Sequence, residues 1–80
     1  SIVLRLLAHP RRLKIIELLE AETEMPVDAL RQSLRLSHAA TSQHLNEMKR
    51  IGLVASERQG LWAYYYVIPE RLKELTSWLS

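Results

Sequence analysis

A helix with clear signals at both ends occupies the middle of this sequence. Ser37 has the side chain of a helix N-cap, apolar residues then recur at helical spacing, and Gly52 supplies the usual stop. A shorter helix, expected from Pro26 to about Leu34, precedes it and leaves only a tight turn around Leu36. Two apolar helices joined by so few residues predict a helix-turn-helix pair.

The remaining elements complete a small mixed fold. They are, in order, a helix over residues 2–8, a helix over 10–19, a polar connector over 20–25, the helix-turn-helix pair, a hairpin of residues 53–58 and 61–67, and a helix over 69–80. We therefore expect a mainly α fold with a β-hairpin wing, a winged helix-turn-helix, as a single domain over residues 1–80. Because the chain opens on Ser1 with an uncapped apolar stretch, we also expect it to be part of a somewhat longer protein.

The polar side of the helix that begins at Ser37 differs from an ordinary solvated surface. At about 100° per residue, Ala40, Leu45 and Met48 share the inward arc. A solvated amphipathic helix more often carries Glu and Lys pairs on its outer face, whereas the first two turns here contain no charged residue. This pattern favours a recognition helix that enters the DNA major groove over a plain surface helix.

The candidate DNA contacts differ in their expected roles. Gln43 suits an adenine edge and Ala39 a thymine methyl group, while the cations further along the helix suit backbone phosphates. At the hairpin tip, Arg58 either contacts a flanking phosphate or has no role beyond the hairpin itself, and both alternatives stay open. For His38, contact with DNA and simple solvation are equally open. The full set of candidates is Ser37, His38, Ala39, Thr41, Ser42, Gln43, Asn46, Lys49, Arg50, Arg58 and Gln59.

The charge distribution agrees with a nucleic-acid partner. The net charge is only +2, but residues 31–60 hold five basic residues against two acidic ones. The hairpin also carries Trp62 and three tyrosines, which could stack on unpaired bases. We expect them to pack against the helices instead, with the tyrosine hydroxyls at the rim.

Four segments together resemble the ArsR/SmtB family of bacterial winged-helix repressors. They are Leu7-Ala8-His9-Pro10-Arg11-Arg12-Leu13, Leu36-Ser37-His38-Ala39-Ala40-Thr41-Ser42-Gln43-His44-Leu45, Gly52-Leu53-Val54, and Arg58-Gln59-Gly60 leading to Trp62-Ala63-Tyr64-Tyr65. The resemblance implies a homodimeric repressor that binds double-stranded DNA at a palindromic operator. It also implies an effector of unidentified chemistry that weakens DNA binding. The sequence departs from the family at His9, usually Asp, and at Leu61, often basic, so the wing is expected to grip DNA less strongly.

The two ends of the chain are the candidate dimer interface. The resemblance places dimer contacts on the first and last helices, and these helices carry more apolar surface than short terminal helices can bury on themselves. The alternative is that both helices pack on their own domain. The candidate interface residues are Ile2, Val3, Leu6, Leu72, Leu75, Trp78 and Leu79.

Several classes of function are disfavoured. The chain has no cysteine, and His38 and His44 are six positions apart on the expected helix, so they do not converge on one metal ion. No metal and no cofactor are therefore expected. Catalysis is not expected either, because Ser42 and His44 do not face each other on a helix and the two glycines, both at turns, form no phosphate-binding loop. No segment has the length of a membrane span, and we expect a cytoplasmic protein. The rival from another class is a winged-helix module that binds a partner protein, for which a neutral or acidic surface near Ser42 and Arg58 would be the sign.

Overall fold

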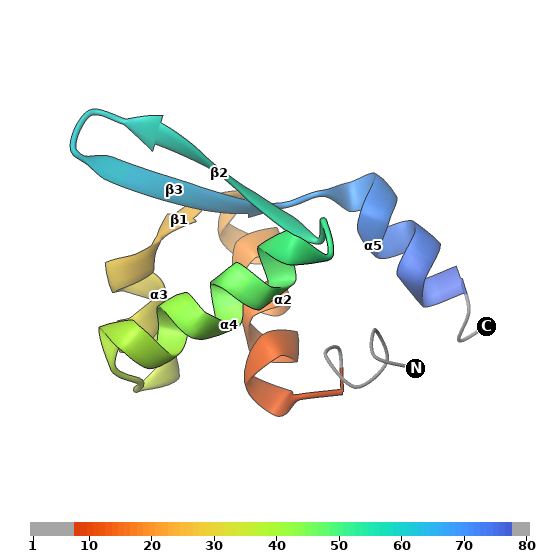
Figure 1. Ribbon diagram of the computed structural model, residues 1–80, viewed down its shortest axis with the longest axis horizontal. Helices are drawn as coiled ribbons and strands as arrows, with labels where there is room; N and C mark the ends of the chain where they lie inside the picture. Colours follow the sequence, from red (N-terminus) through yellow and green to blue (C-terminus); the bar gives the residue numbers. More distant parts are fainter. Residues whose placement is uncertain (1–7, 78–80) are drawn as a thin grey trace.

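The computed structural model describes residues 8–77, and within them the helices pack together beneath a projecting hairpin (Figure 1). The elements in chain order are α2 (Pro10–Glu22), β1 (Met25–Pro26), α3 (Val27–Leu34), α4 (His38–Arg50), β2 (Val54–Gln59), β3 (Trp62–Val67) and α5 (Pro69–Thr76). The expected winged helix-turn-helix is confirmed. The helix expected over residues 2–8 lies outside the described residues.

Helix α2 begins where the sequence predicts and ends later. Pro10 occupies the first turn, and the Nδ1 atom of His9 accepts a hydrogen bond from the backbone N–H of Arg11 at 3.3 Å. The helix continues three residues beyond Leu19, through part of the segment expected to be a connector. Those residues, Glu20, Ala21 and Glu22, are exposed but have good helix propensity, so helix formation there does not need burial.

Backbone capping fixes the helix-turn-helix pair. Helix α3 ends at Leu34, and the C-cap residue that follows, Arg35, has a left-handed φ of 57°. The Ser37 hydroxyl then accepts the backbone N–H of Ala40 at 3.0 Å, as expected of an N-cap. At the other end of α4, Gly52 has a φ of 76°, and the N–H of Leu53 donates to the carbonyl of Met48 at 3.0 Å. This Schellman-type ending favours glycine, and it turns the chain directly into the hairpin.

The sheet contains one strand that the sequence did not predict. Its order is β1-β3-β2 with antiparallel pairing throughout, and Met25 lies opposite Tyr65 in the register. A two-residue strand has no periodicity to detect, and its partner is about forty positions away in the chain. The consequence is that the inner half of the wing is fixed to the segment before α3.

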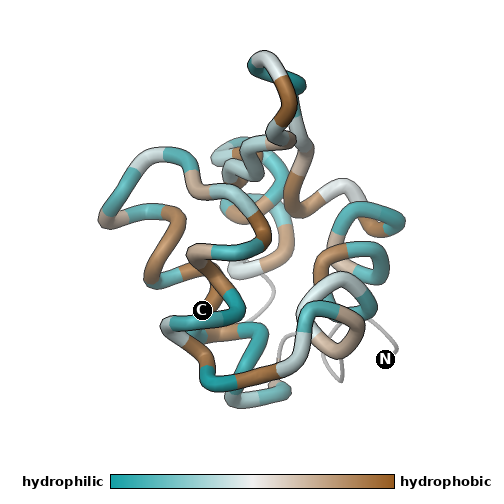
Figure 2. The backbone as a smooth tube through the Cα atoms, turned by 90° about the vertical axis from the view of Figure 1, so that its left-hand side faces the viewer, coloured by the Kyte–Doolittle hydropathy of each residue, from teal (hydrophilic) through white to brown (hydrophobic). Residues whose placement is uncertain are grey.

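The hydrophobic core lies between the helices and the inner half of the hairpin. Along the chain, hydrophobic and hydrophilic stretches alternate at short intervals, as expected if each helix turns one side to the core (Figure 2). The buried hydrophobic residues are Ile15, Ile16, Leu19, Met25, Leu30, Leu45, Met48, Leu53, Val54 and Leu75. Every described helix and strand except β3 contributes to this list, and β3 packs against the cluster through Tyr65 and Val67.

Helix α5 uses part of its apolar face inside its own domain. Leu75 is only 6% exposed and belongs to the core, and Leu72 packs against the core from the edge. The expectation that Leu75 lies in a dimer interface is therefore wrong, because its side chain is already covered. The other candidate interface residues, Ile2, Val3, Leu6, Trp78 and Leu79, lie outside the described residues.

One buried cation joins α2 to α4. Arg12 is 7% exposed; its Nε donates to the Nδ1 atom of His44 at 3.0 Å, and its guanidinium forms an ion pair with Glu47. The ring of His9 meets that of His44 edge-on, with the ring centroids 4.7 Å apart. Because a buried guanidinium is costly unless it is paired, both partners on α4 are needed to keep this helix interface stable.

This arrangement favours the neutral form of His44. Burial lowers the pKa of His44 below its ordinary value of 6.5, and the positive charge of Arg12 lowers it further. His9 and Arg11 act in the same direction, while the carboxylate of Glu47 opposes them. The hydrogen bond from Arg12 also requires a neutral His44, since Nδ1 can accept it only when that atom carries no proton.

We expect the protein to lose stability in mild acid through this histidine. In the unfolded chain His44 takes up a proton near its ordinary pKa, whereas the folded chain resists protonation to a lower pH. The unfolded state is therefore favoured as the pH falls below about 6.5. Urea unfolding at about pH 7.5 and about pH 5.5 measures the change in unfolding free energy.

Two variants isolate the contribution of His44. His44→Asn keeps an amide oxygen near the position of Nδ1 and cannot titrate, so its stability should vary less with pH than that of the wild type. His38→Asn alters an exposed histidine of the same helix and should leave the wild-type pH dependence in place. An unchanged pH dependence in His44→Asn would contradict the assignment.

Candidate nucleic-acid interface

The outer face of α4 is polar, uncharged and open over its first two turns. Ala39, Gln43 and Asn46 are exposed and Ser42 is half-buried. On the opposite side Leu45 is fully buried in the core. The structure thus places these four side chains on one surface, as the helical spacing predicts, and their small and amide side chains have the chemistry that reads base edges in a major groove.

Thr41 does not belong to that surface. Its exposure is 0%, and its Oγ1 donates to the backbone carbonyl of Ser37 at 2.9 Å. The expectation that Thr41 contacts DNA is therefore wrong. The residue lies on the inward arc of α4 and satisfies its hydroxyl within the first turn, a common solution for a buried threonine in a helix.

The start of α4 gathers three polar side chains. The Ser37 hydroxyl caps the helix. One turn after His38, the Oγ atom of Ser42 lies 3.5 Å from the Nδ1 atom of that histidine. Ser37 and His38 are exposed. Because the first turn of a helix also presents unpaired backbone N–H groups, this end of α4 is chemically suited to an anionic oxygen.

The two cations at the end of α4 have different surroundings. The ammonium group of Lys49 donates to the Ser56 hydroxyl at 3.0 Å and lies 6.0 Å from the ring centroid of Tyr65. Lys49 therefore connects the recognition helix to the wing. Arg50 is exposed, and its guanidinium has no acidic partner among the described residues. Of the two, Arg50 is the cation free to bind a phosphate.

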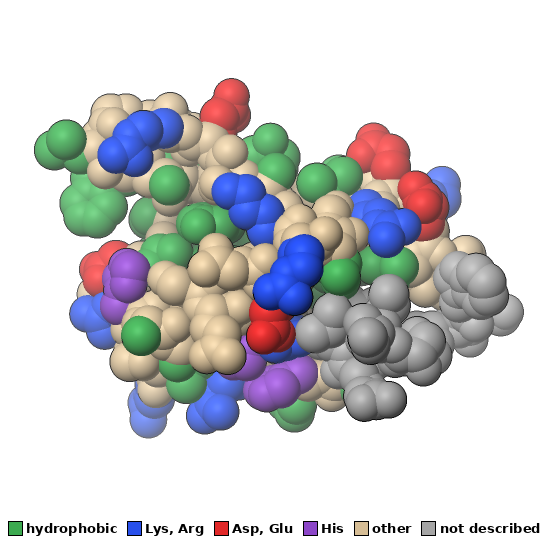
Figure 3. All heavy atoms as spheres, in the orientation of Figure 1, with side chains coloured by type: hydrophobic (Ala, Val, Ile, Leu, Met, Phe, Trp, Pro, Cys, Tyr) green, Lys and Arg blue, Asp and Glu red, His purple; other side chains and the backbone are tan. Residues whose placement is uncertain are grey.

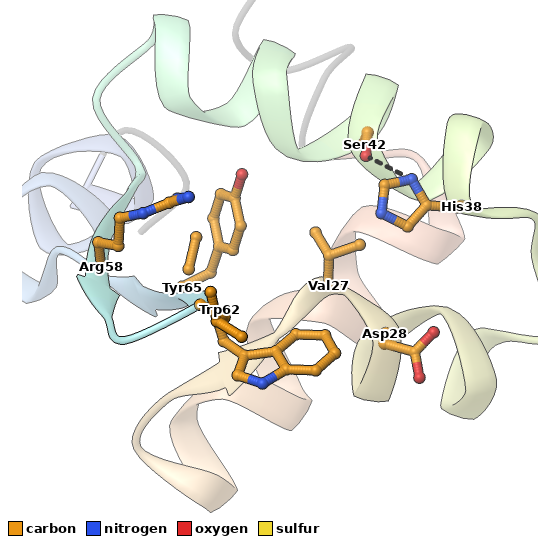
Figure 4. A pocket seen from close by; sticks show the side chains of 9 residues that line it. Val27, Asp28, His38, Ser42, Arg58, Trp62 and Tyr65 are labelled. Atoms are coloured by element: carbon orange, nitrogen blue, oxygen red, sulfur yellow. Dashed lines mark hydrogen bonds between the residues drawn. The ribbon is translucent and has the colours of Figure 1, made fainter.

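A hollow of about 390 Å³ separates the start of α4 from the hairpin. Figure 4 shows Arg58 and Tyr65 on the hairpin side, facing Val27, His38 and Ser42 across the opening. Arg58 is exposed and forms no ion pair within the part of the chain that the structure describes. The space-filling view shows basic side chains on the wing and near the end of α4 on one face, with largely uncharged surface between them (Figure 3).

Gln59 is engaged elsewhere. Its side-chain amide donates to both carboxylate oxygens of Glu24 at 3.2 and 3.3 Å, which links the tip of β2 to the segment before β1. Trp62 also differs from expectation, since it is 56% exposed rather than packed on the helices. The three tyrosines of β3 are half-buried, and of these Tyr65 packs against the hydrophobic core.

Sequence reasoning missed Arg12, which supports the recognition helix from behind. The signal was present, because Arg12 precedes Ile15, Ile16 and Leu19 at the spacing of one helix face, and an arginine in a buried stripe needs a partner. It also missed Arg71 of α5, whose Nε donates to the carbonyl of Ile51 at 2.8 Å and so caps the end of α4.

Within the described residues, no three or more histidine or acidic side chains come together in a way that could hold a metal ion. No helix in residues 8–77 is both long and apolar enough to cross a bilayer.

Comparison with known proteins supplies the family. A family profile described as "Helix-turn-helix domain" matches residues 7–57. An HTH-type transcriptional regulator of Methanocaldococcus jannaschii is 32% identical over 73 residues, which cover 91% of this chain and 82% of the relative. An arsenic resistance transcriptional regulator of Pseudomonas putida is 35% identical over 69 residues, or 86% of this chain, but the match spans only 54% of the relative's length.

A solved structure agrees in fold. It is a homodimeric winged helix-turn-helix DNA-binding domain from Mycobacterium bovis, named as a possible ArsR-family transcriptional regulator. It aligns with a TM-score of 0.80 and 29% identity over 96% of this chain and 71% of its own. These matches are to regulators of transcription and not to enzymes, as expected from the sequence. The chain belongs to the helix-turn-helix transcriptional regulators of the ArsR family.

Proposed function

We propose that this chain is a sequence-specific regulator that binds double-stranded DNA through α4, acting in the cytoplasm. The observation that carries the proposal is the exposed, uncharged face of Ala39, Gln43 and Asn46, with Arg50 and Arg58 beside it, two cations that form no ion pair within residues 8–77. Amide and small side chains read base edges, and cations at either end hold the phosphates of the flanking backbone.

The roles divide along the helix. Gln43 and Asn46 have amide groups for hydrogen bonds to adenine edges, Ser42 can donate or accept, and Ala39 is small enough to meet a thymine methyl group. Ser37 and His38 lie at the positive end of the helix and suit a phosphate. Lys49 contributes mainly by bracing the wing, since its ammonium group is bonded to Ser56.

The surface supports DNA over a partner protein. A protein-binding module predicts a neutral or acidic surface near Ser42 and Arg58. The one carboxylate that lines the hollow is Asp28, and it is bonded to Arg31 at 2.8 Å and to Gln32 at 3.1 Å. Among the described residues, the positive charge of Arg58 therefore has no acidic partner, which favours an anionic ligand.

The protein is further proposed to act as a homodimeric repressor. Support comes from the solved relative of Mycobacterium bovis, which is homodimeric. Two recognition helices related by a twofold axis would read a palindromic operator whose half-sites lie about 34–36 Å apart. A dimer covering such a site blocks transcription by occupying the DNA, and an effector that favours another subunit arrangement would release it.

The base-reading assignment predicts a difference between two variants. DNA selected from a random pool by the full-length protein supplies the probe, and fluorescence anisotropy measures its affinity. Gln43→Ala should reduce the preference for the selected sequence over a scrambled duplex by about 1–3 kcal/mol. Arg50→Ala should weaken binding to both duplexes alike, because a phosphate carries no sequence information.

The control for Gln43→Ala is Ser33→Ala, which removes an exposed uncharged polar group from α3 and should leave base preference unchanged. Equal loss of preference in Gln43→Ala and Arg50→Ala would contradict the assigned roles. Absence of any salt-sensitive binding by the wild type would refute the proposed function itself.

The assembly has a separate test. We expect sedimentation equilibrium of the chain at micromolar concentration to give the mass of a dimer. Leu72→Glu places a charge on the half-buried edge of α5 and should shift the distribution toward monomer. Circular dichroism of the variant confirms that the domain still folds, and a monomeric wild type would contradict the dimer.

A further inference from the structure

The hairpin tip carries hydrophobic side chains that the fold does not use. Leu61 is 88% exposed and Trp62 is 56% exposed, and the only other large hydrophobic residue exposed in the described chain is Leu13 on α2, at 49%. The tip projects well beyond the helices (Figure 1), and hydrophobic side chains protrude from it (Figure 3). Two adjacent exposed hydrophobic residues on a projecting turn contribute nothing to the core and have a cost in solubility.

These side chains adjoin the candidate DNA surface. Leu61 and Trp62 line the same hollow as His38 and Ser42 of α4, and Arg58 faces these two α4 residues across the opening. Figure 4 shows the indole of Trp62 beside Val27 on one side of the opening, with Arg58 on the other. The hollow is therefore lined by apolar side chains at the hairpin tip, by the cation of Arg58 and by the Ser42 hydroxyl across from it, and its carboxylate, Asp28, is paired with Arg31.

We propose that this hollow holds one sugar-phosphate strand of the bound duplex, with the deoxyribose edges against Leu61 and Trp62 and a phosphate between Arg58 and the Ser42 hydroxyl. The inference rests on the proposed function and names a contact that it does not contain. A DNA strand offers both an anionic phosphate and apolar C–H edges on its sugars, and so matches both kinds of wall. An acidic ligand alone leaves the apolar wall uncovered, and an apolar one leaves Arg58 unpaired.

The proposal gives the wing a grip that differs in kind from that of a basic wing. Contact between Leu61 and a sugar releases no counterions, so it adds affinity without adding salt dependence. The contact of Arg58 with a phosphate does release counterions. Its loss therefore makes the fall of log affinity with log salt concentration shallower, by about 0.9 in slope for each contact. The two contributions can therefore be separated in one titration series.

The experiment measures affinity of the full-length protein for the selected duplex at several salt concentrations. Leu61→Ala should weaken binding by about threefold to tenfold per subunit with an unchanged salt slope. Arg58→Ala should weaken binding and reduce the slope. Leu61→Lys should steepen the slope, because it places a new cation beside the backbone.

Matched controls lie on α2, away from the hollow. Leu13→Ala removes an exposed leucine and Lys14→Ala removes an exposed cation, and neither should change affinity or slope by as much as its counterpart on the wing. Unchanged affinity in Leu61→Ala, or an unchanged slope in Leu61→Lys, overturns the proposal and leaves the tip for a protein partner. These results are distinct from failure of the proposed function, in which the wild type does not bind the duplex at all.

Discussion

The ion pair and hydrogen bond of Arg12 support everything that lies on the outer face of the recognition helix. A guanidinium inside a domain of this size is tolerated only because α4 supplies two acceptors, the carboxylate of Glu47 and the imidazole of His44. Both acceptors belong to the second and third turns of the helix whose other side faces solvent. The pairing therefore fixes the rotation of α4 about its axis, and with it the direction in which Gln43 and Asn46 point.

In the wing, too, some polar side chains hold the structure together while others stay free to contact DNA. Lys49 bonds to Ser56, Gln59 bonds to Glu24, and β1 pairs with β3 at the inner end of the hairpin. These contacts hold a long two-stranded ribbon that would be marginal alone. Polar residues used in this way are less available to DNA. Of the two residues expected to contact DNA from the described hairpin, Arg58 and Gln59, only Arg58 has no such bond.

Much of the fold follows from local signals in the sequence. The hydroxyl of Ser37, the proline at position 10 and the left-handed Gly52 all act within a few residues, so their positions predict the helix ends directly. The outer face of α4 follows from helical periodicity in the same way. Thr41 was misassigned because it is a small polar residue on the inward arc, where only the packing of neighbouring helices shows that it is fully buried.

The sequence by itself determined the element order, the helix-turn-helix pair and the residues presented by α4, because capping and periodicity depend on short-range geometry. Only the tertiary structure decided that Met25 joins the sheet, that Leu75 is covered by its own domain and that Leu61 and Trp62 adjoin the start of α4. Each of these depends on contacts between residues far apart in the chain. An apolar side chain has the same periodicity whether its own core, a second subunit or a DNA strand covers it.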